Sequence, residues 1–186
     1  VDYYFKRPIQ IKLVIEKWAF FGLSLLIGLV GIYFLKDEGS INDTTTYTFI
    51  QRLLIGGYSL GVYVAKFIFP YNMSPLYPYP ATLPADVYII GPIAAFSILF
   101  FSYIAFKKDW RPYLFGVLFF LFNVMFVLQV VGAGQGFLAD RFTYIPYAGF
   151  MFIVAYAGQW LWNEKKQTGK IAVYGFGGLL ALYMFM

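Results

Sequence analysis

Long apolar runs, separated by short charged or proline-rich segments, dominate the pattern of this chain. An α-helix needs roughly 20 residues to cross the about 30 Å of hydrocarbon in a bilayer. Runs that approach this length are predicted to be transmembrane helices at Trp18–Leu35, Val87–Phe106, Tyr113–Val131, Ile145–Trp162 and Ile171–Met186. The pattern therefore predicts an all-α integral membrane protein, a polytopic helix bundle with about five spans.

The segment Thr48–Phe69 has the length of a helix but a different composition. It carries Arg52, Lys66 and a Gly56-Gly57 pair, and we expect Pro70 to end it because proline cannot continue a helix. A segment of this kind is a polar-lined span, a re-entrant helix or an interfacial helix.

The distribution of charge favours one of these alternatives. Basic residues concentrate on cytoplasmic loops of membrane proteins. Three basic clusters are therefore expected on the cytoplasmic side: Lys6, Arg7, Lys12 and Lys17; Lys107, Lys108 and Arg111; Lys165, Lys166 and Lys170. All three share one side only if Thr48–Phe69 makes no net crossing. This arrangement puts the loops Lys36–Tyr47, Pro70–Asp86 and Gly132–Tyr144 on the outer face.

Composition supports a membrane protein and narrows the possible chemistry. Hydrophobic residues make up 61% of the chain and charged residues 12%, whereas soluble domains carry about 25% charged residues. The many Phe, Tyr and Trp residues suit lipid contact and interfacial belts, and the net charge of +5 requires no nucleic acid. The absence of Cys and His excludes disulfides and the commonest general base near neutral pH.

The ends of the chain suggest a piece of a longer polytopic protein. It begins at Val1, and it stops at Met186 within an apolar run. We expect residues 1–186 to form a single membrane domain whose remaining part, or another membrane subunit, is its partner.

The pair Asp140-Arg141 is the first candidate site, because charges next to hydrocarbon mark substrate paths or structural clamps. Arg141 has a planar fork that suits phosphate or carboxylate. Asp140 is able to orient Arg141, bind a metal or act as a base. The structural alternative is a salt bridge at a helix end.

Two further groups are candidates. Tyr77 and Tyr79 lie in a proline-rich loop with Tyr71, where they suit either a sugar or the aromatic belt at the interface. Arg52 and Lys66 suit a lipid phosphate, with snorkelling to the headgroups as the alternative.

An ordered set of segments resembles a known family. The set consists of Arg52–Leu54, Tyr63–Pro70, Asn72–Pro80 and Ala139–Pro146. It resembles the membrane region of O-mannosyltransferase-like proteins that combine transmembrane helices with tetratricopeptide repeats. These proteins belong to the GT-C glycosyltransferase superfamily, and the resemblance covers roughly Lys6 to Trp162.

The resemblance implies transfer of a sugar from a polyprenyl-phosphate donor to an acceptor outside a bacterial inner membrane. It also implies a catalytic acid in an outer loop upstream of this chain, and Asp37, Glu38 and Asp43 do not match that motif. The catalytic residue is therefore not assigned here. The expected donor-phosphate ligands are Arg141, then Lys66 and Arg52, with supporting roles for Asp140, Tyr144, Tyr77 and Tyr79.

Other classes of function stay open. A non-catalytic membrane subunit that holds partners in a complex is the main alternative, and a lipid or solute transporter is third. The transporter ranks last because the span centres carry only Asn123 and Gln129 as notable polar groups, whereas transport sites need buried ionisable groups. No metal-ligand set is present, so a divalent metal is compatible with the family but unsupported by the sequence.

Overall fold

In this computed structural model the described residues are 2, 4–8, 10–37, 47–80, 82–128, 136–164, 170–171, 173–175 and 177–178. The helices in order are α1 (Ile11–Ile15), α2 (Trp18–Asp37), α3 (Phe49–Ile68), α4 (Ala85–Lys107), α5 (Arg111–Val124) and α6 (Tyr147–Glu164). Short 3₁₀ turns, η2 (Met125–Val127) and η3 (Asp140–Thr143), and the strands β1 (Tyr77–Pro78) and β2 (Gly136–Leu138) complete the described elements. The predicted helical class is confirmed, with a small sheet added.

The described helices overlap the predicted apolar runs, but the run predicted to reach Val131 forms α5 only as far as Val124. α3 begins and ends within one residue of the predicted segment Thr48–Phe69, and a capping box between Thr48 and Gln51 fixes its start. Within the described residues, α4 is the helix that is long and apolar enough to cross a membrane, and the apolar stretches Trp18–Phe34 and Arg111–Val127 are shorter. Most of the predicted run Ile171–Met186, and all of Gln129–Gln135, lie outside the described residues.

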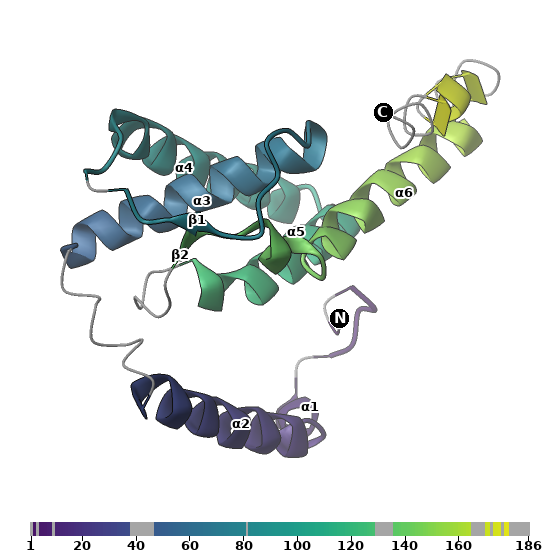
Figure 1. The fold of residues 1–186 in the computed structure, drawn as a ribbon. Helices are drawn as coiled ribbons and strands as arrows, with labels where there is room; N and C mark the ends of the chain where they lie inside the picture. Colours follow the sequence, from purple (N-terminus) through teal and green to yellow (C-terminus); the bar gives the residue numbers. More distant parts are fainter. Residues whose placement is uncertain are drawn as a thin grey trace.

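Helices α3 and α4 lie side by side and run in the same direction (Figure 1). Glycines allow the close approach, since a Cβ on Gly57 would lie 2.6 Å from the carbonyl oxygen of Gly91. Two parallel neighbours need a connection that returns along their length. Residues 69–80, the return segment, make this connection, and the hydroxyl of Tyr47 donates to the carbonyl of Pro80 at 2.6 Å. The chain thus comes back to the start of α3 before α4 begins.

Helices α5 and α6 form the second close pair, in antiparallel orientation. A Cβ on Gly116 would lie 2.4 Å from the carbonyl oxygen of Gly149. The rings of Phe120 and Phe150 stack with centroids 4.2 Å apart. Buried apolar side chains from α3, α4, α5 and β2 form the core between the two pairs: Ile55, Tyr63, Val87, Phe120, Val124, Leu128, Phe137 and Leu138.

The N-terminal region lies largely apart from this core. The ring of Tyr4 contacts Phe115 of α5 and Phe152 of α6. Every described side chain of α2 is exposed. A Cβ on Gly28 would meet nothing within 4 Å. α2 is therefore an apolar helix without a packing partner among the described residues (Figure 1).

Candidate functional site

A buried ion pair joins the last turns of α3 to η3. Lys66 Nζ lies 2.7 Å from Asp140 Oδ2, and the two side chains are only 5% and 8% exposed. The second carboxylate oxygen lies 3.0 Å from the same ammonium group. Because a buried charge without a partner is strongly destabilising, each of these two groups needs the other in the folded chain.

The return segment supplies the remaining hydrogen bonds of this clamp. The backbone N–H of Ser74 and the hydroxyl of Tyr77 donate to Asp140 Oδ2, each at 2.8 Å. Lys66 donates to the carbonyl of Asn72 at 3.2 Å and also contacts the Tyr77 hydroxyl. We call Lys66, Asp140, Tyr77 and Ser74 the clamp. It ties three segments together that are far apart in the sequence.

Local backbone structure explains how Asp140 reaches this position. β1 pairs antiparallel with β2, with Tyr77 opposite Leu138, so Tyr77 and Asp140 come to the same place. The buried Tyr63 hydroxyl lies 3.3 Å from both the carbonyl and the N–H of Ala139. The hydroxyl of Thr143 donates to the Asp140 carbonyl at 2.7 Å and closes the η3 turn. The backbone is thus fixed both before Asp140, at Ala139, and after it, at Thr143.

The electrostatics of the clamp favour the ionised form of the lysine. Burial alone lowers the pKa of Lys66, but hydrogen bonds to Asp140 and Tyr77 outweigh it, so the pKa is raised above 10.5. A cation–π interaction also favours the charged lysine, since Lys66 Nζ lies 4.5 Å from the centre of the Tyr77 ring. Near neutral pH Lys66 is therefore positively charged.

The predicted site residues fall into separate groups. Lys66, Asp140 and Tyr77 meet in the clamp. Arg141, the next residue, is exposed, and its guanidinium lies 5.2 Å from the centre of the Phe142 ring. Tyr144 is 80% exposed. The structural alternative of a salt bridge at a helix end is thus realised, but Asp140 pairs with Lys66 and not with Arg141.

Arg52 lies at the other end of α3. The 14 residues between Arg52 and Lys66 correspond to about 21 Å along a helix. Arg52 is near Tyr79, whose pKa is raised by burial, an effect that the arginine charge opposes. Arg52, Lys66 and Arg141 therefore do not converge on one cavity, and a shared phosphate site of the three is not formed.

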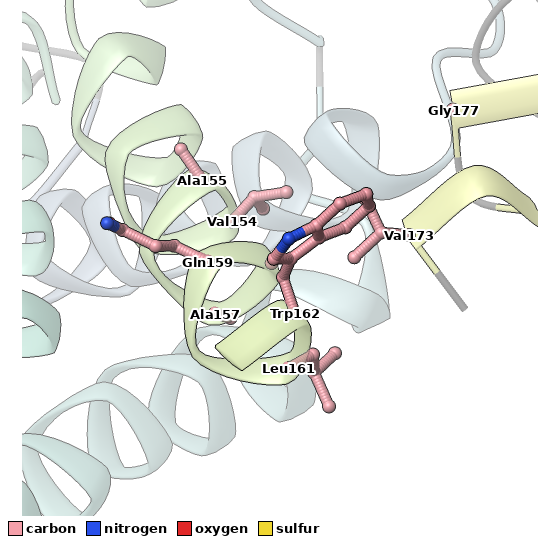
Figure 2. Close-up of a pocket in the computed structure, with 9 residues that line it drawn as sticks. Val154, Ala155, Ala157, Gln159, Leu161, Trp162, Val173 and Gly177 are labelled. Carbon is pink, nitrogen blue, oxygen red and sulfur yellow. The ribbon is translucent and has the colours of Figure 1, made fainter. Parts of the chain in front are cut away.

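Two cavities flank α6, and neither contains a clamp residue. The first, of about 640 Å³, lies between α6 and the residues Val173 and Gly177, and the Trp162 ring lies next to Val173 (Figure 2). The second, of about 550 Å³, lies between α6 and the turn from α4 to α5. Among the described residues, no group of three or more Asp or Glu residues is arranged to hold a metal ion.

Comparisons with protein-family models, with curated proteins and with solved structures gave no match to this chain.

Proposed function

We propose that this chain is the membrane-embedded part of a GT-C-type glycosyltransferase that takes a sugar from a polyprenyl-phosphate donor. One observation carries the proposal: the exposed Arg141 directly follows a residue that is locked into a buried clamp. A guanidinium suits the binding of phosphate, and a fixed backbone next to it holds the side chain in place.

Exposed apolar side chains support insertion into a membrane. On α4 the large side chains Ile93, Phe96 and Leu99 are 60–69% exposed, and described α2 side chains from Trp18 to Phe34 are also exposed. Soluble monomers rarely expose a contiguous apolar patch above a few hundred Å². Lipid is the solvent that suits helices that are apolar on all sides.

The course of the chain supports the expected topology. Because the Tyr47 hydroxyl bonds to the Pro80 carbonyl, the stretch between these residues returns to the end at which it started. α3 with the return segment therefore behaves as a re-entrant unit without net crossing. The contact of Tyr4 with Phe115 brings the segment with Lys6 and Arg7 to the first turns of α5, which begins at Arg111.

Arg141 is assigned the contact with the departing phosphate. In the transfer step the bond between the sugar C1 and the phosphate oxygen breaks, and the acceptor oxygen forms a new bond to C1. A base outside this chain removes the proton of the acceptor hydroxyl. The leaving phosphate keeps the electron pair of the broken bond, and the guanidinium stabilises the resulting charge. Asp140 has a positioning role only, because Lys66, Tyr77 and Ser74 occupy its carboxylate.

Sugar transfer from a polyprenyl-phosphate donor in membranes containing the complete polypeptide tests the proposal. We expect Arg141→Ala to lower kcat about 100-fold or more, the typical loss for a group that stabilises transition-state charge. Arg141→Lys should recover only part of it, because lysine lacks the planar fork. Lys12→Ala, an exposed cation elsewhere, is the control. Unchanged transfer by Arg141→Ala would exclude the phosphate role and favour the non-catalytic membrane subunit.

The location of Arg141 is tested independently. The chain has no cysteine, so single cysteines at Tyr144 and Lys108 report the two sides of the membrane. A membrane-impermeant maleimide added outside should label Tyr144→Cys and leave Lys108→Cys unlabelled. The reverse pattern would reject both the topology and the donor-site assignment.

A further inference from the structure

The cavity between α6 and the α4–α5 turn is lined mainly by aromatic rings. Trp110 and Tyr113 come from the start of α5, and Tyr156 and Trp160 come from α6. These side chains pair an apolar body with a polar N–H or O–H group, the combination found at membrane–water interfaces. The cavity volume of about 550 Å³ is in the range of small-molecule sites.

The turn that carries Trp110 has a defined backbone. Asp109 has φ 52°, and its N–H bonds to the Phe106 carbonyl at 3.2 Å. The N–H of Trp110 bonds to the Ala105 carbonyl at 2.8 Å. This is the bonding pattern of a Schellman motif, in which the left-handed position usually belongs to glycine. Asp109 takes that position and also pairs with Arg111 at 2.9 Å.

A cation borders the cavity. Lys108 is exposed, and its ammonium lies 5.0 Å from the centre of the Trp110 ring. Asp109 lines the cavity, and its negative charge is offset by the pair with Arg111. The surroundings therefore complement an anion whose remaining part is apolar.

We propose that this cavity binds the headgroup of an anionic phospholipid on the side of the membrane that carries the basic clusters. The phosphate lies against Lys108, and the glycerol region lies between the rings of Trp110 and Trp160. Basic pockets between helices on the cytoplasmic side bind such headgroups. The inference rests on the membrane insertion proposed above, but not on glycosyl transfer or on Arg141.

Tryptophan quenching by brominated lipids tests the site directly. A variant with Trp18→Phe and Trp162→Phe keeps Trp110 and Trp160 as the two reporters in this chain. The variant is reconstituted in bilayers with brominated phosphatidylglycerol or brominated phosphatidylcholine. We expect stronger quenching by the anionic lipid. Lys108→Gln should lower the apparent affinity about fivefold, as expected for one lysine at a membrane surface.

Lys12→Gln is the matched control, because it removes an exposed cation that does not border the cavity. Loss of lipid preference in this variant to the same extent would overturn the site. Equal quenching by both lipids would also overturn the proposed site. So would the finding that another segment of the polypeptide fills the cavity. Neither outcome would contradict membrane insertion. No quenching by either lipid would reject membrane insertion, and this inference with it.

Discussion

Replacing Lys66 by methionine removes the positive charge of the clamp and keeps an unbranched side chain of similar length. The Asp140 carboxylate then stays buried with only Tyr77 and Ser74 as donors. At 2.7 Å and an effective dielectric constant of about 20, the lost attraction is about 6 kcal/mol before desolvation. Desolvation offsets part of this value, and removal of one partner from a buried pair typically costs about 3–5 kcal/mol.

This cost has a measurable size in thermal unfolding. For a chain of this length, 1 kcal/mol corresponds to about 2–4 °C in Tm. The Lys66→Met variant is therefore expected to melt roughly 6–20 °C below the unmodified chain. In the double variant with Asp140→Asn, the neutral amide still accepts from Ser74 and no buried charge is left. We expect the double variant to melt above Lys66→Met, with a coupling energy of about 1–3 kcal/mol.

Differential scanning fluorimetry in detergent measures these shifts, and the chain supplies a matched control. Lys17 pairs with Asp2 at 2.6 Å, but the two side chains are 38% and 26% exposed. Water screens such a pair, so Lys17→Met should change Tm far less than Lys66→Met. Equal losses of Tm in Lys66→Met and Lys17→Met would show that burial does not strengthen the clamp. The same conclusion would follow if adding Asp140→Asn to Lys66→Met did not raise the Tm.

Two further predictions concern packing and pH. Gly116→Ala should lower the free energy of unfolding by about 1–3 kcal/mol, because its Cβ would lie 2.4 Å from the backbone oxygen of Gly149. Gly28→Ala is the control, since a Cβ there meets open space, and it should leave the Tm unchanged or higher. The raised pKa of Lys66 means that its ionic stabilisation is complete below pH 10.5 and is lost as the pH rises through the raised value. Tm measured between about pH 9 and about pH 12 should therefore fall more steeply in the unmodified chain than in Lys66→Met, and parallel curves would contradict this.

The helices could be predicted from the sequence because their signals are local. A long apolar run, a proline at the end of α3 and the capping residues before it all act within a few positions. The topology in which Thr48–Phe69 makes no net crossing depends on summed charge and not on local signals, and it stays a prediction.

The clamp could not be predicted, because its members are distant in sequence. Asp140 has an arginine as its neighbour, so local reasoning pairs the two. In the structure Lys66 reaches the carboxylate from α3, and the pairing of β1 with β2 brings Tyr77 to it. β1 is two residues long and contains a proline, which argues against a strand. One signal was available: a lone acid between apolar runs requires a buried cation, and Lys66 interrupts an otherwise apolar helix end.

The separation of 74 residues between Lys66 and Asp140 also imposes an order on biosynthesis. At ribosomal rates of 5–20 residues per second, the lysine emerges roughly 4–15 s before its carboxylate exists. On the membrane insertion proposed above, α4, which is long and apolar enough to cross a bilayer, can enter it before this ion pair forms. α3 and its return segment are thus expected to dock last, after the helices that follow them in the chain.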